Sequence, residues 1–230
     1  MSTIADNISQ VAARIRSAEQ AAQRAANSVQ LLAVSKTKPA AAVREAYAAG
    51  VRDFGENYLQ EALGKQRELT DLPLCWHFIG PIQSNKTRDI AQNFAWVHSV
   101  DRLKIAQRLS EQRPAELPAL NICIQVNVSG EASKSGCTPA DLPALAAAIK
   151  ALPRLTLRGL MAIPEPTDHR AEQDAAFAAV RELNTSLQDS LNLPLDTLSM
   201  GMSHDLESAI AQGATWVRIG TALFGARDYQ

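Results

Sequence analysis

Cysteine is scarce in this chain, and so are blocks of one charge sign. Its three cysteines, Cys75, Cys123 and Cys137, form no C-x-x-C pair. An odd number without such a pair argues against a disulfide framework and a structural zinc site, so we expect no metal. The 23 Lys and Arg nearly balance the 24 Asp and Glu, giving a net charge of −1, and no basic block interrupts the balance. We therefore expect no nucleic-acid partner.

Long apolar runs are missing as well. Nowhere do about 18 apolar residues follow one another, and Met1 to Asn7 shows no basic region followed by an apolar stretch. The sequence thus predicts a soluble protein without export signal or membrane span, and the unpaired cysteines favour the reducing cytoplasm. At 230 residues and 46% hydrophobic content, the chain can bury one sizeable core, in one large domain or two small ones.

What the chain does contain is a regular alternation of short apolar segments and helical patterns. The apolar segments predict strands at residues 31–36, 51–54, 74–79, 95–100, 121–128, 157–163, 195–200 and 215–220. Helical patterns lie between them, at residues 40–49, 57–69, 84–92, 102–112, 139–151, 168–190 and 203–212, after a leading amphipathic helix over residues 3–26.

Strands that alternate with helices pair in parallel. About eight such units in one chain indicate a (β/α)8 TIM barrel with an extra N-terminal helix, ahead of a doubly wound open sheet. We see no linker and no sequence left over for a second domain. Residues 1–230 are therefore expected to form a single domain.

Lys36 closes an apolar run that begins at Leu31, and Thr37-Lys38-Pro39 follows at once. A strand buried on both faces would leave this amine partly desolvated, which lowers the pKa of a lysine and makes it a candidate for a Schiff base with a carbonyl ligand. The structural alternative is a lysine that extends from the strand end into water. The barrel interpretation favours chemistry, because functional residues of barrels collect at the C-terminal ends of strands.

The loops after the other expected strands are also rich in small and polar residues. In barrels, the loops after the seventh and eighth strands commonly bind phosphate through backbone N–H groups and small hydroxyls. In this chain those loops supply Gly201, Ser203, Gly220 and Thr221. The alternative for Ser203 is a simple N-cap of the following helix, with Asp205 and Glu207 in its first turn.

Several of these segments, in order and at their spacing, resemble one known family. They are Ala33-Val34-Ser35-Lys36-Thr37-Lys38-Pro39, Phe54-Gly55-Glu56-Asn57-Tyr58, Trp76-His77-Phe78-Ile79-Gly80-Pro81-Ile82-Gln83-Ser84-Asn85-Lys86, Leu198-Ser199-Met200-Gly201-Met202-Ser203-His204-Asp205 and Val217-Arg218-Ile219-Gly220-Thr221. From about residue 31 to 226 the chain is similar to the YggS/PROSC family of pyridoxal phosphate homeostasis proteins. The stretch from Trp76 to Lys86 is the most specific part, and no motif position departs from the family pattern.

The resemblance implies that Lys36 carries pyridoxal 5′-phosphate (PLP) as a Schiff base. The barrel would be akin to the N-terminal domain of alanine racemase, a fold-type III PLP protein. Asn57 would contact the cofactor beside its ring, and Arg218 would face the pyridine nitrogen. The resemblance places Ser203, Gly220 and Thr221 around the phosphate, with Met200 or Gly201 lining that cradle.

The resemblance places a second group of residues near the cofactor less directly. His77 and Ile79 lie on the third expected strand and could face the cofactor, although His77 fits a barrel core equally well. Glu131 and Lys134 match a loop implicated in handling the cofactor, and Lys86 matches another basic position near the site. Lys38 and Lys65, like Lys86 and Lys134, are candidates for a secondary attachment site.

Chemistry separates two functions that share this cofactor. A racemase needs an electron sink and a base on each face of the substrate carbanion. Arg218 opposite the pyridine nitrogen would weaken the sink, because a guanidinium can only donate a hydrogen bond. Alanine racemase-like enzymes take their second base from an additional C-terminal domain that we do not see here, and Tyr47, Tyr58 and Tyr229 are poor substitutes. We therefore expect no catalytic residues and a non-catalytic carrier that buffers and delivers PLP.

Two alternatives stay open. The first is a PLP-dependent enzyme with weak racemase, decarboxylase or lyase activity. The second is a Schiff-base aldolase that uses Lys36 directly on a sugar phosphate, which Arg218 disfavours because its position suits a pyridine ring. For the carrier, the resemblance implies transient transfer to apo PLP-dependent enzymes, and a monomer is favoured.

Overall fold

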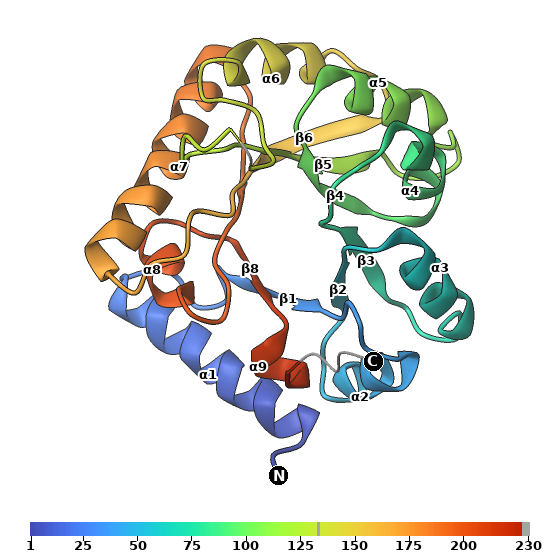
Figure 1. The fold of residues 1–230 in the computed structure, drawn as a ribbon, viewed down its shortest axis with the longest axis vertical. Coiled ribbons are helices and arrows are strands. Elements are labelled where there is room, and N and C mark those ends of the chain that lie inside the picture. Colours follow the sequence, from blue (N-terminus) through green and yellow to red (C-terminus); the bar gives the residue numbers. More distant parts are fainter. Residues whose placement is uncertain (133, 227–230) are drawn as a thin grey trace.

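Eight parallel strands close into a barrel in the order in which they occur along the chain (Figure 1). The structure, a computed structural model, describes residues 1–132 and 134–226. The strands are β1 (Gln30–Val34), β2 (Asp53–Glu56), β3 (Cys75–Phe78), β4 (Trp96–Val100), β5 (Leu120–Gln125), β6 (Leu155–Met161), β7 (Thr197–Ser199) and β8 (Trp216–Ile219). β8 pairs with β1 and completes the ring. The expected barrel is confirmed.

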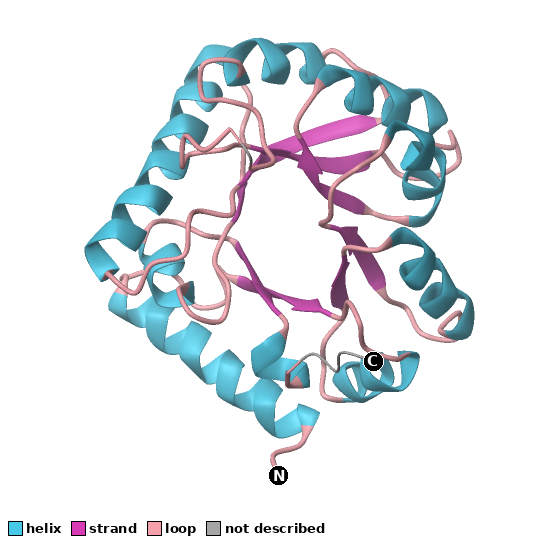
Figure 2. Cartoon of the chain, in the orientation of Figure 1, coloured by secondary structure: helices cyan, strands magenta, loops and turns pink. Residues whose placement is uncertain are grey.

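Helices surround the strands on the outside, as Figure 2 shows. They are α1 (Ile4–Ala21), α2 (Ala40–Ala48), α3 (Leu59–Glu68), α4 (Thr87–Asn93) preceded by the 3-10 turn η1 (Ser84–Lys86), α5 (Leu103–Gln112), α6 (Leu142–Lys150), α7 (Arg170–Leu191), α8 (Leu206–Ala211) and α9 (Thr221–Phe224). Among the residues described, no helix is long and apolar enough to cross a membrane.

The structure moves several expected element boundaries for local reasons. The leading helix ends at Ala21 rather than 26, because Gln23 and Asn27 take positive φ angles of 55° and 63° that no α-helix contains. The second strand begins at Asp53 rather than 51, since the N–H of Val51 bonds back to the carbonyl of Ala46 and completes the turn after α2. The short helix α9 was not expected from the sequence.

The leading helix α1 is part of the core rather than an appendage. Its apolar face, with Ile8, Val11 and Ile15, is buried together with the residues of the barrel wall. The N-terminus is capped by Thr3, whose hydroxyl accepts from the N–H of Asp6 while the Asp6 carboxylate accepts from the N–H of Thr3. In Figure 1, α1 runs beside α8 and α9, the two helices that follow the last strands.

The contact between β6 and β7 depends on a glycine. Gly159 of β6 lies so close to β7 that a Cβ atom would stand 1.8 Å from the carbonyl oxygen of Thr197. That oxygen belongs to backbone, so it cannot move without displacing the strand. Any side chain at this position would therefore push apart two neighbouring strands of the closed barrel.

We predict that Gly159→Ala lowers the free energy of unfolding by about 3 kcal/mol or more, because the added methyl group forces β6 away from β7. Urea unfolding followed by circular dichroism measures the change. Gly64→Ala in α3 is the control, since its Cβ would meet only one side-chain atom, at 3.9 Å. That variant should gain roughly 0.5–1 kcal/mol from helix propensity. Equal stability of the two variants would contradict the prediction.

Candidate functional site

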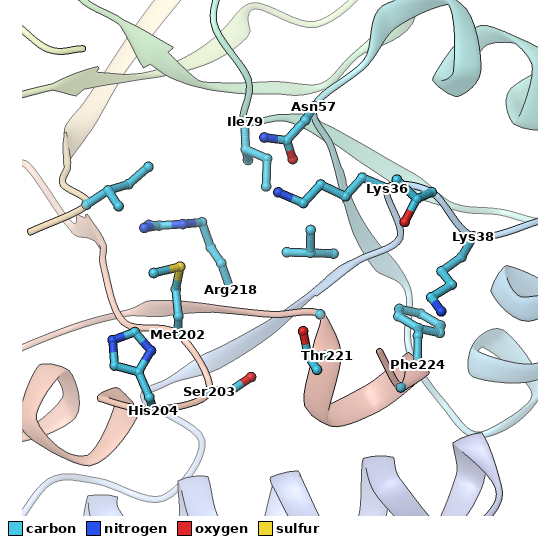
Figure 3. A pocket seen from close by; sticks show the side chains of 15 residues that line it. Lys36, Lys38, Asn57, Ile79, Met202, Ser203, His204, Arg218, Thr221 and Phe224 are labelled. Atoms are coloured by element: carbon cyan, nitrogen blue, oxygen red, sulfur yellow. The ribbon is translucent and has the colours of Figure 1, made fainter. Parts of the chain in front are cut away.

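A pocket of about 240 Å³ opens at the C-terminal ends of the strands. Most of its lining residues come from the loops after β1, β7 and β8, with single residues from the loops after β2, β3 and β6. They are Val34, Lys36, Thr37, Lys38, Asn57, Ile79, Ile163, Met202, Ser203, His204, Arg218, Gly220, Thr221, Phe224 and Gly225. Figure 3 shows how these side chains surround the space. The pocket thus brings together six of the eight residues first expected around the cofactor.

Lys36 follows the end of β1 and points into this pocket. The N–H of Ser35 still bonds to the carbonyl of Gly55, so the chain keeps its strand course until the residue before Lys36. Thr37 then takes a positive φ of 63°, and the N–H of Lys38 bonds back to the carbonyl of Ser35 in a tight turn. In Figure 3 the Lys36 amine extends toward the guanidinium of Arg218.

A buried ion pair lies beside the turn that presents Lys36. The Glu56 side chain is fully buried, and its Oε1 accepts from the Ser35 hydroxyl at 2.7 Å and from Lys65 Nζ at 2.6 Å. Lys65 Nζ also donates to the carbonyl oxygen of Ser35 at 2.6 Å and contacts Glu61 at 2.8 Å. Burial raises the pKa of Glu56, and the Lys65 ammonium opposes that rise. These contacts fix the residue that precedes Lys36.

Arg218 reaches the pocket from β8 and is almost completely buried. Its NH1 donates to the Ser199 hydroxyl at 2.8 Å, and its NH2 donates to the carbonyl of Ala162 at 3.0 Å. Burial lowers the pKa of Arg218 to about 10, which still leaves the guanidinium positively charged at neutral pH. A guanidinium has five N–H donors and no acceptor, so donors beyond these two remain to serve a ligand.

Asn57 carries an unsatisfied acceptor at the edge of the pocket. Its Oδ1 atom is buried, and it has no hydrogen-bond partner among the residues described. The backbone of Asn57 is held close to the loop after β3, where a Cβ on Gly80 would come within 2.4 Å of the Asn57 carbonyl oxygen. A buried polar atom without a partner costs free energy, so this one is suited to a ligand donor.

Ser203 and Thr221 form the side of the pocket away from Asn57, where Figure 3 shows their hydroxyls near each other. Ser203 is not the cap of the next helix: α8 begins only at Leu206, and Asp205 precedes it. Gly220 precedes α9, which begins at Thr221. The N–H of Leu223 bonds to the carbonyl of Gly220, whereas no helical carbonyl precedes the N–H groups of Thr221 and Ala222. This side of the pocket therefore has donors for an anion.

The two acidic residues near this anion-binding side are turned to other partners. Asp205 Oδ1 accepts from the N–H of Met202 at 2.7 Å. Glu207 forms an ion pair with Arg14 of α1 at 2.9 Å, and Arg14 NH2 also donates to the carbonyl of Ser203 at 2.9 Å. The carboxylates thus shape the loop around Ser203 instead of facing an anion in it.

Helix α1 supports the same side of the pocket from behind. Besides Arg14, Asn7 of α1 donates through Nδ2 to the carbonyl of Leu223 in α9 at 2.8 Å. Sequence reasoning missed both residues, because polar positions on an amphipathic helix are expected to face solvent. The sequence offers no separate signal for them.

Of the other described residues that the sequence places near the cofactor, only Ile79 lines this pocket. Met200 is fully buried in the core, and Gly201 precedes the lining residue Met202. His77 is fully buried inside the barrel. Lys86 lies in η1, and Glu131 contacts Lys134 at 3.5 Å. Lys134 lines an adjoining pocket that shares Asn57, Ile79 and Ile163 with the first.

Comparison with known proteins places the chain in a family. The sequence model for the alanine racemase N-terminal domain matches residues 7–228. The pyridoxal phosphate homeostasis protein of Pseudomonas aeruginosa is 80% identical over 229 residues, covering 100% of this chain and 98% of that protein. PipY of Synechococcus elongatus, solved with PLP bound, is 45% identical with a TM-score of 0.85, covering 97% of this chain and 100% of that one.

A more distant likeness concerns the fold alone. Alanine racemase from Corynebacterium glutamicum superposes with a TM-score of 0.70 at 19% identity, covering 94% of this chain and 61% of that one.

We predict that Lys65→Met destabilises the protein by about 3 kcal/mol at neutral pH, because it leaves the buried Glu56 carboxylate without its counter-ion. The loss should grow with pH. Without the ammonium the pKa of Glu56 rises further in the folded state, so folding favours the protonated acid, and that contribution disappears as pH rises through the folded-state pKa. Urea unfolding at about pH 4 and about pH 8 measures the difference.

The double variant Lys65→Met/Glu56→Gln is the control for this prediction, because it removes both charges. It should lose most of the added pH dependence. A deficit in Lys65→Met that is the same at both pH values would show that Glu56 does not carry the effect.

Proposed function

The chain belongs to the YggS/PROSC family of pyridoxal phosphate homeostasis proteins, which has the alanine racemase N-terminal domain fold, and on this basis we propose that it holds PLP as a Schiff base on Lys36. Its role is to buffer and deliver the cofactor. The observation that carries this proposal is the opposition of Lys36 and Arg218 across one pocket, with the Ser203 and Thr221 hydroxyls at its side (Figure 3).

The donors and acceptors of the pocket fit the functional groups of PLP. When bound, the cofactor supplies an aldehyde that an amine can capture and an electron-withdrawing pyridine ring. Lys36 offers the amine, and Arg218 offers N–H donors to the ring nitrogen, which carries a lone pair. Ser203, Gly220 and Thr221 offer hydroxyl and backbone N–H donors for a phosphate. The buried Oδ1 of Asn57 is suited to a further donor.

A carrier role is supported by what surrounds Lys36. Arg218 stays positively charged at neutral pH and can only donate, so it would keep a ring nitrogen unprotonated and weaken the ring as an electron sink. No tyrosine is among the described residues that line the pocket. Arg52 lies over the ring of Tyr47 at 4.0 Å, and Tyr58 is 52% exposed. Tyr229 lies outside the described residues.

Access to the pocket also suits delivery. Ile163 lines the pocket and is 44% exposed, so apolar surface borders the opening directly. We propose that an apo PLP-dependent enzyme approaches from this side and takes up the cofactor transiently, with the carrier acting as a monomer. The cysteines are free thiols, which suits the reducing cytoplasm as its location.

Weak racemase activity is the second candidate, and His204 is the observation that favours it. Its imidazole lines the pocket, lies 3.4 Å from Asp205 and has a 44% exposed side chain. An imidazole in this position could accept a proton from a substrate. Two arguments weigh against substantial activity: the Arg218 cation weakens the sink, and the pocket stays open to water.

We predict that purified protein incubated with PLP gains a visible absorbance band that borohydride removes, and that peptide mapping finds the reduced adduct on Lys36. Lys36→Ala should lose the band. Lys38→Ala is the matched control, because Lys38 lines the same pocket while its Nζ donates to the carbonyl of Ala226 at 2.8 Å, and it should keep the band. An adduct mapped to another lysine would contradict the assignment of Lys36.

We also predict that the PLP-loaded protein does not racemise L-alanine measurably, because Arg218 weakens the electron sink and no tyrosine base lines the described pocket. Chiral chromatography of the amino acid after long incubation provides the measurement, with a PLP-dependent alanine racemase as the positive control. Steady turnover that disappears in His204→Ala would instead establish the second candidate.

A further inference from the structure

A chain of hydrogen-bonded side chains runs through the barrel interior from Arg218 to the opposite end of the barrel. Arg218 NH1 lies 2.8 Å from Ser199 Oγ, and Ser199 Oγ lies 2.7 Å from His98 Nδ1. His98 Nε2 lies 2.9 Å from His77 Nδ1. His77 Nε2 lies 2.9 Å from Asp53 Oδ1. Five side chains from β8, β7, β4, β3 and β2 are thereby linked without a gap.

The two end members of this hydrogen-bonded series, Arg218 and Asp53, face different surroundings. Arg218 lines the pocket at the C-terminal ends of the strands. Asp53 is the first residue of β2, so in a barrel of parallel strands it lies toward the N-terminal mouth, and its side chain is 28% exposed. Between them His77 and His98 are fully buried. The series of hydrogen bonds therefore connects the pocket with solvent on the far side of the barrel.

The chemistry of the ends fixes the direction of every hydrogen bond between them. A guanidinium only donates, so Arg218 donates to Ser199; a carboxylate only accepts, so Asp53 accepts from His77 Nε2. A neutral imidazole has one donor and one acceptor, which makes His77 Nδ1 the acceptor and His98 Nε2 its donor. His98 Nδ1 then accepts from the Ser199 hydroxyl. Each inner member donates one bond and accepts one.

Burial supports the neutral imidazoles that this argument requires. Desolvation lowers the pKa of His77, although Asp53 opposes the shift. Desolvation lowers the pKa of His98 well below its ordinary value, and the positive charge of Arg218 lowers it further. Packing also holds the His77 ring in place. The Trp96 ring stacks on it with a centroid distance of 5.4 Å and an interplanar angle of 12°, and the Trp216 ring makes an edge contact with a centroid distance of 4.9 Å.

We propose that Asp53, His77, His98 and Ser199 form a hydrogen-bond relay in which every donor points from Arg218 toward Asp53. The relay positions Arg218 and couples it to the Asp53 charge at the N-terminal mouth of the barrel. The proposal rests on the proposed function in that Arg218 serves the ring nitrogen of the cofactor. Because each hydrogen bond polarises the next, a change at Asp53 alters how firmly Ser199 holds the guanidinium. The four residues are positioning residues, and none of them touches the cofactor.

A metal site is the competing interpretation at the Asp53 end. Asp53, Cys75 and His77 bring three possible ligand atoms within 4.8 Å of one another, and Cys75 Sγ lies 3.6 Å from His77 Nε2. A metal would need the lone pair of His77 Nε2, which in the relay carries the proton directed at Asp53. It would also need the thiolate of Cys75, whose pKa burial raises to about 12. The relay is therefore favoured, and metal binding becomes an outcome of the test.

The first test uses the protein without cofactor. Long-range 1H–15N spectra of its four histidines report which ring nitrogen carries the proton. We expect His77 and His98 to be neutral, with the proton on Nε2, and unchanged by one equivalent of Zn²⁺. If His77 carries its proton on Nδ1, or if zinc moves the proton from Nε2 to Nδ1, the relay is overturned in favour of the metal site.

The second test cuts the relay at Ser199. In Ser199→Ala we expect a shift of the His77 ring nitrogens, although His77 does not bond to Ser199, and a roughly tenfold loss of PLP affinity because a charge-assisted hydrogen bond is lost. Borohydride should still link PLP to Lys36. The matched control is Ser110→Ala in α5, which removes a buried hydroxyl bonded to the carbonyl of Pro153. It should change neither quantity.

Two results of this experiment have distinct meanings. If Ser199→Ala matches Ser110→Ala in both the His77 spectrum and PLP affinity, the coupling does not exist. If the wild-type protein forms no adduct on Lys36, the proposed function fails, while the His77 spectrum still decides whether the relay is continuous.

A third variant keeps the proposal testable if Ser199→Ala does not fold. Asp53→Asn changes the partly exposed end of the relay, with Asp196→Asn as control, a carboxylate that instead pairs with Arg158 at 2.9 Å. We expect Asp53→Asn to shift the ring nitrogens of His98, two groups away, and to weaken PLP binding roughly threefold. A spectrum of His98 identical to that of the control would overturn the relay.

Discussion

Closure of eight parallel strands into one ring is the constraint on which the rest of this structure depends. Because all strands run in the same direction, their C-terminal ends meet on one rim, and short loops from distant parts of the sequence must share it. Lys36 and Arg218 are far apart in the chain, yet β1 and β8 are neighbours in the sheet and bring them to one pocket. Backbone pairing accounts for the site before any ligand is considered.

Residues whose position follows from strand ends could be predicted from the sequence, whereas residues defined by tertiary pairing could not. Lys36 and Arg218 stand at or near the ends of apolar runs, so the barrel interpretation placed them on the functional rim. Lys65 was a candidate for cofactor attachment, because nothing in a helical pattern reveals that its ammonium is buried against Glu56. The link between His77 and His98 joins separate strands, and neither local pattern indicates it.

A single bend explains why residues of the loop after β7 face in different directions. Met200 continues the course of β7 and turns into the core, while Met202, two residues later and after the bend at Gly201, faces the pocket. A sequence motif identifies such a loop but does not say which of its residues the bend exposes. In the same way, the polar residues Asn7 and Arg14 acquire their role only when α1 packs behind α8 and α9.

The buried partners of Lys65 have a consequence for chemical selectivity. A neutral amine attacks an aldehyde through its nitrogen lone pair, and an amine whose lone pair is bound to a proton cannot do so. Lys65 Nζ is paired with Glu56 at 2.6 Å and with Glu61 at 2.8 Å, directly beside the turn that presents Lys36. The same carboxylates that stabilise the rim therefore engage the Lys65 amine and limit its competition with the amine proposed to bind the cofactor. A site that captures an aldehyde on one lysine thus depends on occupying the other amines nearby as well as on presenting that lysine.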